Sequence, residues 1–461
     1  MTKNEAQAET KWPTHVIRSG AHTPNLNESD PKPDDHKDHV EPWLSALLQA
    51  EHLNLVIGSG LTTALAMEAG APAVDMAVKD VRNTYAFAVR IAAANSAKRL
   101  GRGNPNIEDQ IRAVQELVGG LQTLAGVEAL GGNETIPDSV SPKLDAWEEV
   151  LNDTLVSFLK QILDTERGIN QALTDVDEPK KADSVRRLLG GFLLPFASRT
   201  ASRERLHIFT TNYDRIVEHG CDLLGLRVID RFLGNLSPVF RSSRLGVDLH
   251  YNPPGIRGEP RYLEGVVRLT KLHGSLDWRA RTGPSGQAEV QRCALPFGAA
   301  EGHPEISDCP GGRVLVYPNA AKDVETLEYP YADLFRDFAA ATCRPNSVVV
   351  TYGYGFGDDH VNRVLSDMLT IPSTHLVIIS YDDAAGRLRT FCERVARDVQ
   401  ITLLVGPHFG DLTTLVENYL PKPAIDRATW RMMDLLRRRA RPRADDPVRT
   451  NEGSEGGTEE P

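Results

Sequence analysis

The chain has 461 residues and a formal net charge of −11. This length exceeds one average domain and predicts two to three units, or one core with large insertions. The negative charge argues against nonspecific DNA binding over the whole surface, because phosphate contacts require clustered Lys and Arg. We therefore expect any nucleic-acid contact to be at most indirect.

The five cysteines are scattered, and no C-x-x-C pair occurs. This pattern disfavours both a disulfide framework and a four-cysteine zinc site. The N-terminus lacks the apolar segment of a signal peptide, and no stretch reaches the roughly 18 apolar residues that a membrane span requires. We expect a cytoplasmic protein in a reducing compartment, without membrane contact.

Short apolar runs alternate with helical patterns along most of the chain. Residues 1–40 come first and are polar and rich in Pro, Asp and His, so we expect a disordered arm there. The following alternation predicts an α/β fold, a Rossmann-like parallel sheet with helices on both faces. The predicted strands are LNLVIG (53–58), LHIFTT (206–211), VVRLTKL (266–272), RVLVYP (313–318), SVVVTYG (347–353), THLVIIS (374–380) and ITLLVG (401–406).

Residues 76–200 interrupt this alternation. Their apolar residues recur every three or four positions, as amphipathic helices require. We interpret them as a helical subdomain inserted into a domain that spans residues 41–420. For the remaining residues, 421–461, the sequence predicts a C-terminal helix with an Arg-rich segment at 431–443, followed by a disordered acidic tail.

The first two predicted strands end in motifs that could bind a ligand. Gly58-Ser59-Gly60 would let backbone N–H groups approach a phosphate at a helix N-terminus, although a tight structural turn explains it equally well. TTNYD (210–214) lies where an open α/β sheet places ligand-binding groups. Taken alone, this motif is better explained as a helix cap formed by Asn212 or Asp214.

Two later strand ends carry a histidine and a polar cluster. In LTKLHGSLDW, His273 could project into the same crevice as a general base, although a lone histidine at a strand end is more often structural. In VTYGYGFGDDHVNRVL, three glycines precede the polar cluster 358–362. A metal site in that cluster lacks further ligands at a recognisable spacing, so helix capping and nucleotide contacts are preferred and no metal is expected.

In this order, the four motifs resemble the SIR2 (sirtuin-like) superfamily, and more closely its bacterial branch of defence-associated NAD-consuming proteins. GSGLT (58–62) is similar to the family's GAGxS, and TTNYD to TQNxD. KLHGS (271–275) is similar to the catalytic His-Gly, and GYGFGDDHVN (353–362) to the later Gly-containing nucleotide segment. The alternating strands extend the likeness over roughly 45–420, apart from the insertion.

The resemblance implies a role for each motif residue. Gly58, Ser59 and Gly60 would line the NAD+ diphosphate, and Asn212 would hold the nicotinamide ribose and the attacking water. Asp214 would orient its loop, and His273 would be the general base acting through a ribose hydroxyl. The further NAD+ contacts would be Thr62, Thr211, Gly353, Tyr354, Gly355 and Asp358.

Departures from the family pattern bear on the reaction. The two C-x-x-C pairs of the deacylases are missing, so no zinc is expected, and the family's GIPDFR is matched at best by Gly70-Ala71-Pro72. The Gln of TQNxD is Thr211. Water is then preferred to an acyl-lysine as acceptor, which predicts an NAD+ glycohydrolase. An NAD-dependent protein deacylase and a noncatalytic NAD- or ADP-ribose-binding assembly subunit stay open as alternatives.

The resemblance also implies regulation, because an NADase that is always active would poison its host. Relatives act in anti-phage defence by NAD+ depletion, some with a HerA-like ATPase. We therefore expect a homo-oligomer and consider a HerA-like ATPase as partner. The insertion (76–200) and the Arg-rich segment (431–443) are the candidate assembly surfaces.

Overall fold

The protein is described by a computed structural model, and its described residues fall within one compact unit, residues 1–421. The Arg-rich segment and the rest of the predicted C-terminal region lie outside the described residues. The structure describes residues 12–24, 26, 31–99, 103–129, 140–200, 202–243, 247–251, 261–283, 285–300, 302–307, 314–316 and 329–421.

An eight-stranded, mostly parallel sheet forms the centre of residues 1–421, which confirms the predicted α/β class. The strand order is β1-β15-β14-β13-β2-β3-β9-β4, and only β1 runs antiparallel to its neighbour. The strands are β1 (Val16–Arg18), β2 (His52–Ile57), β3 (His207–Thr210), β4 (Arg227–Ile229), β9 (Val266–Lys271), β13 (Ser347–Tyr352), β14 (His375–Ser380) and β15 (Ile401–Val405).

Successive residues of each strand face opposite layers of helices, as the pleat requires. Leu55 and Ile57 of β2 join one hydrophobic core, whereas Val56 between them joins the other. The first core is closed by α1 (Pro33–Leu47), α2 (Ser59–Ala69), α6 (Pro179–Ala197) and α7 (Ile216–Leu223). The second is closed by α10 (Tyr331–Thr342), α11 (Asp359–Met368) and α12 (Arg387–Val395). Burial on both faces explains the nearly continuous apolar runs of these strands.

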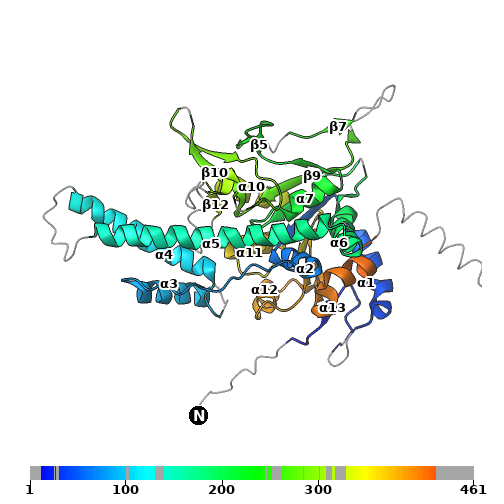
Figure 1. Cartoon of the computed structure of the whole chain (residues 1–461). Coiled ribbons are helices and arrows are strands. Elements are labelled where there is room, and N and C mark those ends of the chain that lie inside the picture. The colour runs from blue at the N-terminus through cyan, green and yellow to red at the C-terminus, as the bar shows by residue number, and fades with distance from the viewer. Residues whose placement is uncertain are drawn as a thin grey trace, which may run out of the picture. The chain divides into compact units, whose positions relative to one another are not determined.

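The inserted helices have a hydrophobic cluster of their own and are also joined to the sheet. Figure 1 shows the long helix α5 (Ser141–Thr174) running past α3 (Ala86–Arg99) and α4 (Ile107–Ala129) and reaching α2 and α6. Its outer part packs with α3 and α4 around the buried Trp147. Its last turns, including Ile169 and Leu173, belong to the core of the sheet. The insertion is therefore joined to the core of the sheet by a continuous helix.

Two expectations from the sequence differ from the structure. Part of the arm predicted to be disordered is ordered, because β1 pairs with β15 and α1 begins at Pro33. The run RVLVYP does not enter the parallel sheet. Its described residues form β12 (Val314–Val316), which pairs antiparallel with β10 (Gly274–Thr282). A strand pattern indicates a strand but not its partner, which explains this error.

The remaining elements are short. A five-stranded antiparallel sheet has the order β12-β10-β11-β6-β5, and β7 pairs with β8. Among the described helices, none has the length and hydropathy needed to span a membrane. The bounds are β5 (Phe232–Leu233), β6 (Val239–Phe240), β7 (His250–Tyr251), β8 (Arg261–Tyr262), β11 (Ala288–Arg292), α8 (Pro304–Ser307), α13 (Pro407–Gly410), α14 (Leu412–Thr414), η3 (Asp398–Gln400) and η4 (Leu415–Tyr419).

Candidate functional site

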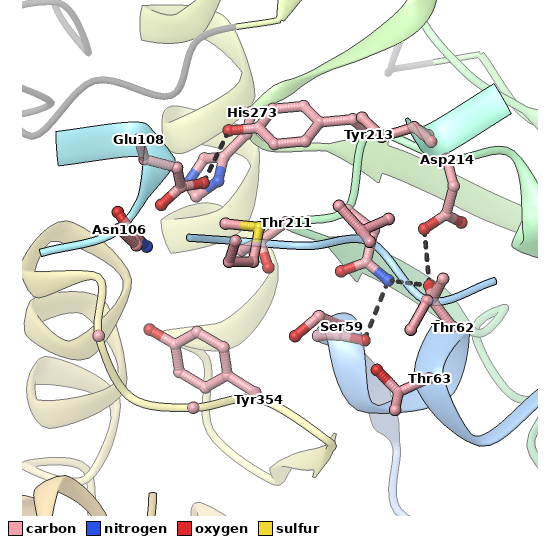
Figure 2. A pocket seen from close by; sticks show the side chains of 18 of the residues that line it. Ser59, Thr62, Thr63, Asn106, Glu108, Thr211, Tyr213, Asp214, His273 and Tyr354 are labelled. Atoms are coloured by element: carbon pink, nitrogen blue, oxygen red, sulfur yellow. Dashed lines mark hydrogen bonds between the residues drawn. The ribbon is translucent and has the colours of Figure 1, made fainter. Parts of the chain in front are cut away.

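A cavity of about 330 Å³ lies where four neighbouring strands, β13, β2, β3 and β9, reach their carboxyl ends. This is the edge at which open α/β sheets bind ligands. Ten of the twelve residues that the sequence predicted for the site line this cavity, and Figure 2 shows it from close by. These ten are Gly58, Ser59, Thr62, Thr211, Asn212, Asp214, His273, Tyr354, Gly355 and Asp358.

The other two predicted residues, Gly60 and Gly353, do not line the cavity but touch each other. Gly60 N–H donates to the Gly353 carbonyl at 3.1 Å, and Gly58 N–H donates to the Tyr352 carbonyl at 3.0 Å. A Cβ on Gly60 would lie 2.5 Å from Gly353 Cα, and one on Gly58 would lie 2.4 Å from the Gly353 oxygen. Gly353 also has φ of +58°, which favours glycine. These glycines therefore let two loops meet, whichever ligand binds beside them.

The side chain of Asn212 is held in one orientation by a chain of hydrogen bonds. Its Nδ2 donates to the Gly58 carbonyl at 3.0 Å and to Thr62 Oγ1 at 3.1 Å. The Thr62 hydroxyl in turn donates to Asp214 Oδ2 at 2.6 Å. Because a carbonyl and a carboxylate accept but do not donate, these contacts identify the amide nitrogen. Both of its hydrogens are used, so Oδ1 is the atom that Asn212 can offer to a ligand.

Asp214 serves both the cavity and the following helix. While Oδ2 accepts from Thr62, Oδ1 accepts from the Ile216 N–H at 3.2 Å, at the start of α7. The sequence left a helix cap and a functional role open as alternatives for this motif. The N-cap position of α7 is Arg215, which makes no side-chain cap bond, so Asp214 contacts the start of the helix from one residue earlier. Both Asp214 and Asn212 line the cavity.

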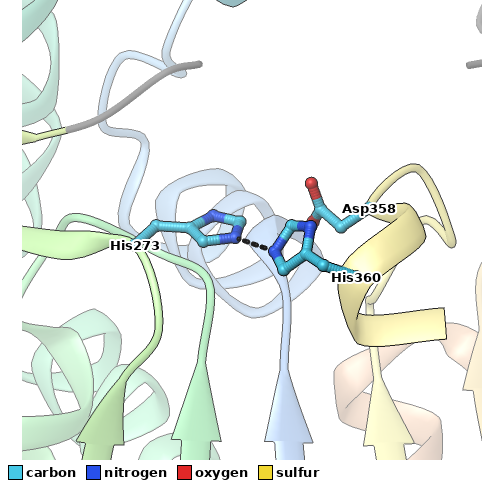
Figure 3. Close-up of side chains that lie close together, drawn as sticks. All are labelled: His273, Asp358 and His360. Carbon is cyan, nitrogen blue, oxygen red and sulfur yellow. Dashed lines mark hydrogen bonds between the residues drawn. The ribbon is translucent and has the colours of Figure 1, made fainter. Parts of the chain in front are cut away.

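His273 is buried and forms a pair with a second histidine. Its Nε2 lies 3.0 Å from Nε2 of His360, and the two ring centroids are 5.2 Å apart. Asp358 lies beside them, and a donor atom from each of the three side chains falls within 4.8 Å of the others. Figure 3 shows that His273 comes from the loop after β9, whereas His360 and Asp358 come from the start of α11.

The inserted helices supply a wall of the cavity that the sequence reasoning did not identify. Glu108, in the first turn of α4, accepts a hydrogen bond from the Tyr213 hydroxyl at 3.2 Å, and Figure 2 shows this pair close to His273. Burial, followed by the nearby Glu108 charge, raises the pKa of Tyr213 well above its usual range, so the phenol keeps its proton. The other lining residues from the insertion (76–200) are Met76, Asn106, Phe158, Ile162 and Thr165.

A buried ion pair joins the loop that carries Asn212 to α5. Glu166 of α5 is completely buried and accepts hydrogen bonds from the Arg215 backbone N–H at 2.7 Å and from its guanidinium. Arg215 also donates to the carbonyls of Leu295 and Pro296. Burial raises the pKa of Glu166, and the positive charge of Arg215 offsets part of this effect.

The opposite side of the cavity carries Tyr354 and a positive charge. The Tyr354 hydroxyl donates to Asn362 Oδ1 at 3.0 Å, and burial, followed by the Asp358 charge, raises its pKa well above the usual range. Arg387 of α12 lines the cavity, and its Nε donates to the Gly355 carbonyl at 2.7 Å. The sequence motifs did not point to Arg387, because it lies outside all four of them.

A comparison with protein families agrees with this geometry over part of the chain. Residues 206–404 match the family model of the SIR2-like domain, which supports the SIR2 superfamily and an NAD-related activity in general terms. SIR2-like domains are commonly NAD-dependent enzymes. The match includes Asn212, His273 and Asp358 but neither the β2–α2 loop nor the inserted helices. None of the curated proteins matches the chain.

Replacing Glu166 with Gln should lower the free energy of unfolding by about 3–5 kcal/mol, because it leaves the buried Arg215 charge without its partner. Urea denaturation measures this loss. Asp183→Asn is the matched control, since Asp183 pairs with Arg186 at 3.3 Å on the surface of α6 and its loss should cost no more than about 0.5 kcal/mol. Equal losses in the two variants would contradict the prediction.

Gly60→Ala should lower the free energy of unfolding by about 1–3 kcal/mol, because its methyl group overlaps the backbone of Gly353. Gly119→Ala is the control. Gly119 is exposed in the interior of α4 with no atom within 4 Å of the added carbon, so this change should stabilise the protein slightly. Thermal unfolding of the two variants measures whether each change destabilises or stabilises the protein. A Gly60→Ala variant as stable as the wild type would disprove the overlap.

Proposed function

We propose that the protein is an NAD+ glycohydrolase that cleaves the nicotinamide–ribose bond to give ADP-ribose and nicotinamide. The observation that carries this proposal is the fixed amide of Asn212, whose free Oδ1 faces a cavity that also contains His273. An oriented acceptor and an imidazole on adjacent strand ends suit a reaction in which water attacks a sugar carbon. The SIR2-like match over residues 206–404 supports NAD+ as the substrate.

In the proposed reaction, the bond between C1′ of the ribose and the nicotinamide nitrogen breaks, and its electron pair neutralises the pyridinium. The ribose carbon then has oxocarbenium character, which nearby oxygen atoms and carboxylates stabilise electrostatically. Asn212 Oδ1 would accept a hydrogen bond from a ribose hydroxyl or from the attacking water. His273 would receive the proton that the water loses, through a ribose hydroxyl.

The two sides of the cavity fit different parts of the substrate. The N-terminus of α2, with Ser59, and the Arg387 guanidinium would bind the diphosphate, because backbone N–H groups and guanidinium both suit phosphate oxygens. The side with Glu108 and His273 would hold the nicotinamide ribose. Phe158 and Ile162 of α5 would cover it and exclude bulk water.

The wider role rests on the resemblance described above. We propose a cytoplasmic effector of anti-phage defence that acts by NAD+ depletion, forms a homo-oligomer and is regulated by a partner such as a HerA-like ATPase. The need to restrain an NADase supports regulation of this kind. Light scattering that gives only a monomer, alone and with the products of neighbouring genes, would contradict this part of the proposal.

Asn212→Ala and His273→Ala should each lower the rate of nicotinamide release from NAD+ by about 100-fold or more, because each removes a group that acts on the reacting sugar. Chromatography of the products measures the rate. The controls are Asn54→Ala and His207→Ala, which remove a buried amide and a buried imidazole from the amino-terminal halves of β2 and β3. The folded protein of each control variant should release nicotinamide at the wild-type rate. Unchanged release in both site variants would disprove the assignment.

Arg387→Ala should raise KM for NAD+ about 10-fold with little change in kcat, because the guanidinium would bind the diphosphate equally in the ground state and the transition state. Arg394→Ala provides the control, since Arg394 lies on the same helix but is exposed to solvent. Steady-state kinetics separate the two constants. A lower kcat at unchanged KM would place Arg387 elsewhere in the mechanism.

A further inference from the structure

Three potential metal ligands meet at the edge of the cavity although the sequence separates them. His273 and His360 are 87 residues apart, and their Nε2 atoms lie 3.0 Å from each other. Both side chains are more than nine-tenths buried, and Asp358 is partly exposed beside them. The cluster 358–362 lacked a further ligand in the sequence, and the fold supplies one from a different strand end.

We propose that His273, His360 and Asp358 form a binding site for one divalent transition-metal ion of the zinc type. A tetrahedral zinc ion binds imidazole nitrogen at about 2.0–2.1 Å, which places two such nitrogens about 3.3 Å apart. The observed 3.0 Å separation is within a few tenths of an ångström of that value. Two imidazoles and one carboxylate are also a common set of zinc ligands.

The surroundings favour a cation at this point. Asp358 and Glu108 both line this cavity, and Asp359 follows Asp358 at the start of α11. Arg387 is the positively charged residue among the residues that line the cavity, and its Nε donates to the Gly355 carbonyl. With three protein ligands, the fourth position of the ion would be open for water, as in zinc sites that are not purely structural.

Metal binding would switch off the proposed reaction. A neutral imidazole has one nitrogen lone pair, because its other nitrogen carries a proton. If the ion takes the lone pair of His273 at Nε2, the ring has none left with which to accept a proton from the substrate. Zinc bound at this site would then inhibit the reaction, and a chelator that removes the zinc would restore it. This consequence rests on the proposed function, whereas the metal binding itself does not.

The first test measures metal binding by the full-length chain. After treatment with EDTA and its removal, zinc is titrated calorimetrically into wild type, His360→Ala and His219→Ala. His219 is stacked on Phe297 and is not part of the proposed site, so it is the matched control. We expect His360→Ala to bind one zinc ion fewer than wild type and His219→Ala to bind the same number. Equal stoichiometry in wild type and His360→Ala overturns the site.

Two further measurements cover misfolding and other ligands. Asp358→Asn, which changes a partly exposed residue, should weaken zinc binding at least 10-fold even if His360→Ala fails to fold. Cobalt bound at the same site should show visible d–d bands without the thiolate charge-transfer band of a cysteine ligand. A thiolate band that titrates with this ion would assign the metal to cysteine and overturn the site.

The last test separates the metal site from the proposed function. One equivalent of zinc should lower nicotinamide release by wild type at least 10-fold, and EDTA should restore it. His360→Ala should release nicotinamide at its own rate, equal with and without zinc. Zinc that binds without inhibiting an active wild type overturns the inhibitory role. If no variant releases nicotinamide, the proposed function fails, while the binding data still decide the metal site.

Discussion

The buried ion pair between Glu166 and Arg215 is the interaction on which the site depends most. Arg215 follows Asp214 directly, so its contacts with Glu166 and with two backbone carbonyls hold the end of the TTNYD loop against α5. Such a pair is not an efficient source of stability, because desolvation cancels much of the attraction. The pair instead fixes the position of the loop, because the loss of either partner would leave the other charge buried without a counter-ion. The inserted helices are thereby attached to the residues that face the cavity.

The hydrogen bonds that orient the polar side chains of the cavity depend on this attachment. The loop places Asp214 where it accepts from the Ile216 N–H at the start of α7, and the same carboxylate accepts from Thr62, which in turn orients the amide of Asn212. The chain ends on the Gly58 carbonyl, whose position is determined by the close contact between the β2 and β13 loops. One connected set of contacts therefore joins the start of α7, the orientation of Asn212 and the close approach of the glycines. A structural and a ligand-facing role of TTNYD are compatible because they apply to different atoms.

The sequence predicted most of the parallel sheet, because residues buried on both faces leave long apolar runs. It also predicted the strand ends that meet at the cavity. It could not predict β1, which has three residues and is stabilised by pairing with β15 at the far end of the chain. Glu108 and Arg387 carry no local signal either, since their place at the cavity results from the packing of α4 and α12. The prediction that Gly60 and Gly353 contact the nucleotide stays a prediction, and the structure adds a steric reason for their small size.

The inserted helices link the chemistry of the site to the rest of the protein. α5 is a single helix whose inner turns belong to the core of the sheet and whose outer turns pack with α3 and α4. The same insertion supplies Glu108, which accepts from Tyr213, the residue between Asn212 and Asp214. A displacement of α4 or α5 would therefore act on the TTNYD loop from two directions, through Tyr213 and through Arg215. A partner that moved the outer turns of these helices would therefore shift the loop that carries Asn212, the residue proposed to hold the substrate.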